Sequence, residues 1–312
     1  PRAAIRIASI DDSLDPWLSH LGVDDFDLVV TRDLKTAASI GEHSRKRAIA
    51  VGHEPDSGAI ATVIGDWLDA RRVGIRVDVP SWDVADRCEE FHFARDIQRA
   101  MEDAGHPTRI HFRPEWDAWW AARDDVGFHL LGRDVAKRRE GRLEVLWHIS
   151  HPDAGSRAAY AAHDVAFVAS DAFAAWMDGQ VDIPVRSLHQ ATDPRRFDPS
   201  MRGRHHELLF VGNATGVRNH IIDDLLPIDH ELAVYGEAWT PDRLDPRYVA
   251  GDHIPSEELG GYYASADIVL NDHSPDVRRE GFLSNRLYDA SAAGAFVISD
   301  GIDGIEAEFA GG

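Results

Sequence analysis

The chain has 312 residues, of which 44% are apolar, which is enough to build two or more packed domains. Its formal charge of −21 argues against a nucleic-acid partner, because binding to a phosphate backbone needs net or local positive charge. The single cysteine, Cys88, excludes an internal disulfide and a thiol-rich zinc site. No run approaches the ~20 apolar residues of a membrane-spanning helix, and no secretory pattern opens the chain, so we expect a cytoplasmic protein without a transmembrane segment.

Residues 1–72 carry the weakest pattern. Residues 26–38 and 47–56 echo residues 163–176 and 184–194, and either a partial repeat or the general likeness of α/β units explains the echo. We expect residues 1–72 to form extra α/β elements, either packed on the next domain or belonging to a partial domain.

From residue 73, short apolar runs alternate with helical patterns, which predicts a mostly parallel sheet covered on both faces. The predicted strands are residues 73–79, 108–112, 126–131, 143–148, 165–169 and 185–188, and the predicted helices are residues 84–104, 156–162 and 172–177. We assign residues 73–199 to an N-terminal, acceptor-side domain of the Rossmann-like type.

A second series follows a linker rich in Pro, Asp and Arg, residues 191–206. Its predicted strands are residues 207–212, 232–235, 268–270 and 295–299, and its predicted helices are residues 217–226, 256–264 and 284–293. We assign residues 204–312 to a C-terminal Rossmann-like domain, compatible with a truncated domain that lacks a closing helix. Two doubly wound domains would face each other across a central cleft, where ligands of open sheets bind.

The motif segment, residues 279–300, reads REGFLSNRLYDASAAGAFVISD and combines a charged loop, a capped helix and a buried strand. Ser284 or Asn285 can cap the helix, whose first N–H groups favour an anion. Gly294 suits the end of the helix. Glu280 comes just before the helix, close to whatever is attached to a bound phosphate.

A second phosphate contact is predicted where residues 208–212 lead into a helix. There Gly212, Asn213 and Arg218 form a glycine-bearing turn with one cation, a pattern that suits a diphosphate but also occurs in turns that bind nothing. Arg286 is the second candidate cation, or else a solvent-facing helix residue. Arg279 lies in a charged loop after a predicted strand and could neutralise a leaving diphosphate.

In LWHISHPD, His148 and His151 lie three residues apart at a strand end. Either could hydrogen-bond a transferred sugar or act on an acceptor hydroxyl. The alternatives are a pair of metal ligands, for which no third ligand has recognisable spacing, and histidines that only complete a loop network.

The motif segment resembles the donor site of GT-B glycosyltransferases, specifically the group-1 branch that includes the spore-maturation-protein type. The matching positions are Glu280, Gly281, Phe282, Asp289 and Gly294. The branch usually has two glutamates with seven residues between them, whereas Glu280 and Asp289 have eight between them. LWHISHPD and residues 251–270 resemble other segments of the branch, and residues 253–255 match the loop whose backbone contacts the nucleotide base.

This resemblance implies an α/β protein of the GT-B fold that moves a sugar from a nucleotide-diphosphate-sugar donor to an unknown glycan, protein or small-molecule acceptor. It implies retention at the anomeric carbon, a hexosyltransferase-like role in glycan biosynthesis, and no cofactor or metal. The implied catalytic residues are Glu280, His151 and His148. The implied donor-binding residues are Gly212, Asn213, Arg218, His253, Ile254, Pro255, Arg279, Phe282, Leu283, Ser284, Asn285, Arg286 and Asp289. A sugar-nucleotide epimerase and a non-catalytic sugar-nucleotide-binding protein remain alternatives.

Overall fold

The computed structural model describes residues 7–10, 28–31, 47–50, 71–214 and 220–309. The chain divides into two compact units, Pro1–Ala70 and Arg71–Gly312. In the first unit, the described residues form a parallel sheet of β1 (Ile7–Ile10), β2 (Leu28–Thr31) and β3 (Arg47–Ala50), in that order. The rest of the expected N-terminal α/β elements lies outside the described residues.

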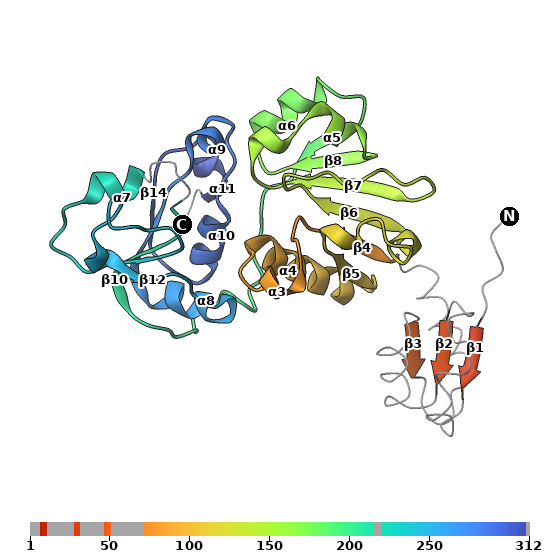
Figure 1. Ribbon diagram of the computed structural model, residues 1–312, viewed down its shortest axis with the longest axis horizontal. Helices are drawn as coiled ribbons and strands as arrows, with labels where there is room; N and C mark the ends of the chain where they lie inside the picture. The colour runs from red at the N-terminus through yellow and green to blue at the C-terminus, as the bar shows by residue number, and fades with distance from the viewer. Residues whose placement is uncertain (1–6, 11–27, 32–46, 51–70, 215–219, 310–312) are drawn as a thin grey trace. The chain divides into compact units, whose positions relative to one another are not determined.

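The second unit begins with a six-stranded parallel sheet in the order β5-β4-β6-β7-β8-β9 (Figure 1). Its strands are β4 (Val73–Arg76), β5 (Thr108–His111), β6 (Val126–Leu130), β7 (Leu143–His148), β8 (Val165–Val168) and β9 (Val185–Ser187). Its α-helices are α3 (Trp82–Ala85), α4 (Glu89–Asp103), α5 (Arg157–Ala161) and α6 (Asp171–Asp178), joined by short 3-10 turns η3 (Arg113–Glu115), η4 (Ala121–Arg123) and η5 (Pro152–Ala154). All six strands match predicted ones.

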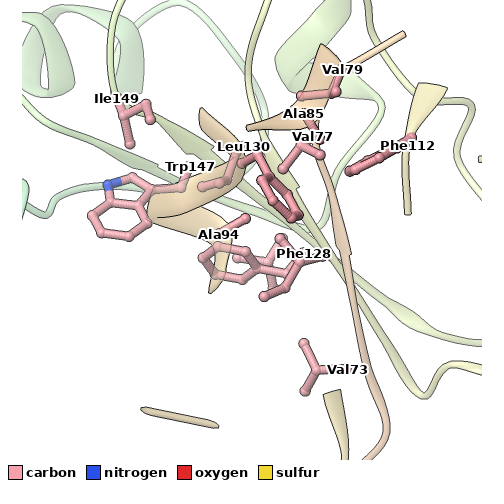
Figure 2. Close-up of a cluster of buried hydrophobic side chains, with 13 residues drawn as sticks. Val73, Val77, Val79, Ala85, Ala94, Phe112, Phe128, Leu130, Trp147 and Ile149 are labelled. Carbon is pink, nitrogen blue, oxygen red and sulfur yellow. The ribbon is translucent and has the colours of Figure 1, made fainter. Parts of the chain in front are cut away.

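Alternate residues of the strands build the core that α4 covers. Val73, Ile75 and Val77 of the β4 region face the same way and belong to one cluster with Phe128 and Trp147. Figure 2 shows Val73, Val77, Phe128 and Trp147 in this cluster. From the helix, Phe91 and Ala94 are buried and three residues apart, so they lie on one face. The intervening strand residues point to the opposite face of the sheet.

A five-stranded parallel sheet follows, in the order β12-β11-β10-β13-β14. Its strands are β10 (His206–Val211), β11 (Leu232–Tyr235), β12 (Val249–Gly251), β13 (Ala266–Asn271) and β14 (Val297–Ser299). Its helices are α7 (His220–Leu225), α8 (Ser256–Ser265), α9 (Pro275–Arg279), α10 (Asn285–Ala292) and α11 (Ile305–Phe309), with the 3-10 turn η6 (Pro246–Tyr248). The fold is therefore mixed α/β with two successive parallel sheets, as expected from the sequence. None of the helices within the described residues is long and apolar enough to cross a membrane.

Four elements differ from the expectation, among them helix α11, for which no helix was predicted. The helix predicted over residues 84–104 is broken between α3 and α4. Trp82 before the break and Phe91 after it both pack on the Phe112 ring, with centroid distances of 4.3 and 5.5 Å. Strand β12 was not predicted, because its three residues, Val-Ala-Gly, are too few to show an apolar run in the sequence. Helix α9 was predicted as a loop, although Pro275 stands at its first position, where proline favours a helix start.

Candidate functional site

The order of the second sheet contains one reversal, between β10 and β13. From β10 the chain continues to β11 on one side, whereas from β13 it continues to β14 on the other side. Ligands of open α/β sheets bind at the carboxyl ends of the strands at such a reversal. These ends are Val211 and Asn271. The strand order therefore indicates a ligand site between the loops that follow these two residues.

Arg286 of α10 lies between these two strand ends. Its Nη1 donates a hydrogen bond to Oδ1 of Asn271 over 2.9 Å, and its guanidinium carbon lies 4.9 Å from the centroid of the Phe210 ring. A Cβ at Gly212 would lie 2.8 Å from Arg286 Nη2, so glycine leaves room for the guanidinium. Asn271 is fully buried and donates from Nδ2 to Ser299 Oγ over 2.9 Å. These contacts hold a cation at the strand reversal.

The other residues of the first loop bind the neighbouring loop in the structure. The N–H of Gly212 donates to the Tyr235 carbonyl over 2.8 Å, and Oδ1 of Asn213 accepts from the Glu237 N–H over 2.8 Å. Arg218 lies outside the described residues, so its predicted phosphate contact stays a prediction.

His273, two residues after β13, connects the site to strand β14. Its Nε2 accepts a hydrogen bond from the Ser284 N–H at 3.0 Å, so its Nδ1 carries the proton and donates to Asp300 Oδ1 at 2.6 Å. Burial would raise the pKa of Asp300, but the hydrogen bonds that it accepts from the side chain and backbone of His273 lower it below its ordinary value. His273 thus ties the start of α10 to the end of β14.

The start of α10 is less open to an anion than the sequence suggests. Ser284 caps the helix as predicted, and its Oγ accepts from the Arg286 N–H over 3.3 Å. The Leu287 N–H donates to the Ser284 carbonyl over 3.1 Å, and the Ser284 N–H is used by His273. Of these first backbone N–H groups, only the N–H of Asn285 has no hydrogen-bond partner among the described residues. The start of α10 therefore leaves one backbone donor, rather than several, for an anion.

A cavity of about 750 Å³ opens at the ends of β13 and β14. Its walls are formed by His220, His273, Pro275, Arg278, Arg279 and residues 301–306. Arg278 and Arg279 supply positive charge, opposed by Asp303 and Glu306 from the segment after β14. The cavity is large enough for a small-molecule ligand with an anionic group.

Glu280 follows α9 directly and lies beside Arg279, which lines this cavity. Arg279 Nε donates to Glu280 Oε1 over 2.8 Å, and the two side chains are 62% and 31% exposed, respectively. Among the described residues, the second carboxylate oxygen of Glu280 has no hydrogen-bond partner, so it could accept a hydrogen bond from a ligand. Gly281, the next residue, has a φ of +70°, a conformation that favours glycine.

His148 and His151 lie in very different surroundings at the end of β7. His148 is fully buried, and burial lowers its pKa to about 4, so its ring is neutral at pH 7. Its Nε2 donates to the His151 carbonyl at 3.1 Å, and its Nδ1 accepts from the Tyr160 hydroxyl at 2.8 Å. Both ring nitrogens of His148 are therefore used in hydrogen bonds within the protein. This side chain holds the His151 backbone in place. His151 is exposed, with Nδ1 2.8 Å from Ser150 Oγ.

No metal arrangement surrounds these histidines. Within residues 71–214 and 220–309, no group of three or more His, Cys, Asp and Glu side chains is placed to hold a metal ion.

The η5 turn after His151 contacts α9, so the end of β7 lies beside the start of the motif segment.

Asp289 in the middle of α10 is a buried carboxyl group, 8% exposed. Its Oδ1 accepts from Thr192 Oγ1 over 2.6 Å, and its Oδ2 accepts from Asn285 Nδ2 over 2.9 Å. Burial raises the pKa of Asp289 to about 7, against the opposing effects of the Thr192 hydrogen bond and the Arg196 charge. Asp289 thus contacts the linker through Thr192. Its contact with a sugar-nucleotide donor stays a prediction.

The remaining predicted donor contacts are mostly buried. Phe282 and Leu283 are each 1% exposed, and Ile254 is 5% exposed. His253 is exposed and Pro255 is the N-cap of α8, in the loop after β12. Buried residues can contact a nucleotide through backbone atoms only, as the resemblance implies for residues 253–255.

Sequence reasoning did not single out Asp300 as a site residue, nor Gln190, which directly precedes the linker, nor Thr192 within the linker. Asp300 directly follows the last strand, and a carboxylate at a strand end was a usable signal. Gln190 and Thr192 lie in a segment without periodicity, so no local signal marks them.

Residues 218–312, about the last third of the chain, match a family model described as glycosyl transferase-like. This part of the chain is therefore similar to glycosyltransferases. It contains α10, the cavity and Glu280, but not the loop glycine at position 212. Comparison with curated proteins finds no significant sequence match.

Two solved glycosyltransferases show distant structural similarity. An alpha-glucosyltransferase in complex with UDP and a 13-mer DNA containing an HMU base has 11% identity and a TM-score of 0.46, covering 74% of this chain and 80% of its own. A glycosyltransferase from Rickettsia africae ESF-5 has 9% identity and a TM-score of 0.38, covering 99% of this chain and 82% of its own. With TM-scores below 0.5, neither similarity adds to what the strand order shows.

Proposed function

We propose that this protein is a glycosyltransferase that moves a sugar from a nucleoside-diphosphate sugar to an acceptor hydroxyl. The observation that carries the proposal is the family match over residues 218–312, which coincides with the segment that lines the strand reversal and the cavity. The retaining outcome, the absence of a metal requirement and the cytoplasmic location are further parts of the proposal, supported by the resemblance of the motif segment and by the sequence composition.

The donor diphosphate would lie at the strand reversal, against the Arg286 guanidinium and the Asn285 N–H. A planar guanidinium suits a phosphate because it offers two parallel N–H donors. Arg278 and Arg279 line the adjacent cavity and would balance the charge that develops on the leaving diphosphate. Arg218, whose structure is not described, would add a further cation.

Glu280 would orient the transferred sugar by accepting hydrogen bonds from its hydroxyl groups. During transfer, the bond between the anomeric carbon and the diphosphate oxygen breaks, and its electron pair leaves with the diphosphate. A bond forms between the anomeric carbon and the acceptor oxygen, whose proton passes to the departing diphosphate or to His151. His148 would act indirectly, because its side chain is enclosed and its Nε2–H holds the His151 carbonyl.

A panel of UDP-glucose, GDP-mannose, ADP-glucose and dTDP-glucose tests the proposal. Binding of one donor should raise the melting temperature, since a ligand that binds only the folded state stabilises it by mass action. Glu280→Gln should then lower the rate of donor hydrolysis or transfer at least about tenfold. The matched control is Glu102→Gln, an exposed carboxylate on α4 outside the site.

Products separate transfer from the alternatives. A free nucleotide sugar with a changed sugar and no glycoside would identify an epimerase. If a donor binds but Glu280→Gln leaves every product and hydrolysis rate at the level of the Glu102→Gln control, the transferase proposal fails and a binding protein is left.

A further inference from the structure

The backbone around Glu280 is held by residues that precede the second sheet. Ser170, the N-cap of α6, donates from Oγ to the Glu280 carbonyl over 2.6 Å. The same oxygen accepts from the Phe173 N–H over 3.1 Å, so both its donor and an acceptor position are used. A Cβ at Gly281 would lie 3.2 Å from Ser170 Oγ, which adds to the need for glycine there. The turn that carries Glu280 is thus fastened to the start of α6.

Phe282 is packed into the core of the first sheet rather than into the second. Its ring centroid lies 5.0 Å from that of His148 and 5.3 Å from that of Phe173. It belongs to one apolar cluster with Leu146 of β7 and Tyr160 of α5. Because Phe282 is 1% exposed there, the segment next to Glu280 cannot shift without opening this core.

Gln190 joins the two sides through its amide group. Its Nε2 donates to the Ile149 carbonyl over 2.9 Å and to the Leu283 carbonyl over 3.0 Å. Ile149 directly follows β7, and Leu283 precedes the N-cap of α10. Both amide hydrogens are therefore used to hold the end of β7 and the motif segment at a fixed separation.

We propose that Gln190 is a positioning residue that sets the place of Glu280 relative to the exposed His151 at the end of β7. This inference rests on the proposed function. The Arg286 guanidinium, which is assigned to the diphosphate, is held by Asn271 of the second sheet, and Asn271 in turn binds Ser299 rather than Gln190. Loss of the Gln190 amide should therefore lower turnover while leaving donor affinity nearly unchanged.

The test variant is Gln190→Glu, which keeps the size of the side chain but replaces the N–H donors with a carboxylate facing two carbonyl oxygens. The matched control is Gln98→Glu, because Gln98 Nε2 also donates to a backbone carbonyl, that of Thr108 over 2.9 Å, far along the chain from the motif segment. If Gln190→Glu does not fold, Gln190→Met removes the donors without adding a charge.

Donor binding is measured by calorimetry with the nucleotide sugar that stabilises the unmodified protein, and turnover is measured as hydrolysis of that donor. We expect the turnover number of the Gln190 variant to fall about 10- to 100-fold, the loss typical of a displacement near 1 Å, with the dissociation constant changed less than threefold. Gln98→Glu should change neither. Hydrogen exchange should accelerate together at residues 149–154 and 281–284 in the Gln190 variant only.

Two results overturn the inference: turnover equal to that of the Gln98 control, or equal losses of turnover and donor affinity. A failure of the proposed function looks different, because the unmodified protein would then bind or hydrolyse none of the four nucleotide sugars. That result would remove both proposals.

Discussion

Replacement of Asp289 with asparagine should change how stability depends on pH. The pKa of Asp289 rises from 3.8 to about 7 in the folded protein, mainly because the carboxyl group is buried. Between pH 4 and pH 7 the folded state therefore holds a proton that the unfolded state has released. The free energy of unfolding must then fall as pH rises through this window.

The size of the effect follows from the shift. About three pH units at about 1.4 kcal/mol each correspond to about 4 kcal/mol between pH 4 and pH 7. Asparagine has nearly the same shape and cannot ionise. Its carbonyl can accept from Asn285 Nδ2, and its amide can donate to the Thr192 hydroxyl, which now accepts. The stability of Asp289→Asn relative to the unmodified protein should therefore rise by up to about 4 kcal/mol from pH 4 to pH 7.

Urea unfolding at pH 4.5, 5.5, 6.5 and 7.5 measures this difference. The comparison between the two proteins cancels other titrating groups, such as buried His148, whose lowered pKa makes stability rise with pH over an overlapping range. Asp229→Asn is the control, since Asp229 is an exposed aspartate in the loop before β11. A difference that is the same at pH 4.5 and pH 7.5 would show that Asp289 is ionised throughout, and the reasoning would be refuted.

Two further substitutions test the charged groups of the two sheets. Arg286→Gln should weaken binding of UDP or another nucleoside diphosphate by about 1.5–3 kcal/mol, since Asn271 and the cavity remain but the charge-assisted bond is lost; unchanged affinity by calorimetry would remove Arg286 from the site. Glu144→Gln should lower the free energy of unfolding by about 3 kcal/mol, because it removes the carboxylate that pairs with buried Arg76 at 3.1 Å and with buried Arg142 at 2.6 Å, and leaves Arg142 only Asp124 at 4.0 Å. Glu237→Gln, which breaks an exposed ion pair, should cost under about 1 kcal/mol, and equal effects in urea would contradict this argument.

The strands could be predicted because they are apolar runs buried on both faces of parallel sheets. Ile75, Leu146, Leu209 and Val269 are fully buried, and each stands in a run that the sequence shows directly. The break between α3 and α4 could not be predicted in this way. It depends on a tertiary contact with Phe112, a residue beyond the helical pattern.

The candidate site was only partly visible in the sequence. His148 and His273 look alike locally, since each is a histidine at the end of an apolar strand. The first packs against Phe282 and Tyr160, whereas the second binds Asp300 and the start of α10. The partner that each histidine contacts depends on residues 11 to 134 positions away along the chain. The position of a histidine at a strand end therefore predicts that it lies near the site, but not what it does there.

The linker carries more of the site than its composition suggests. Gln190, directly before the linker, holds the Leu283 carbonyl before α10, and Thr192 of the linker binds the Asp289 carboxyl in the middle of α10. An apolar run or a helical period cannot mark such residues, because their bonds are made by single polar groups to partners about 90 residues away. Their effects should also be separable: Gln190 acts on the geometry around Glu280, whereas Thr192 acts on the charge state of Asp289. A segment without secondary structure thereby connects the first sheet to the part of the chain that resembles a donor site.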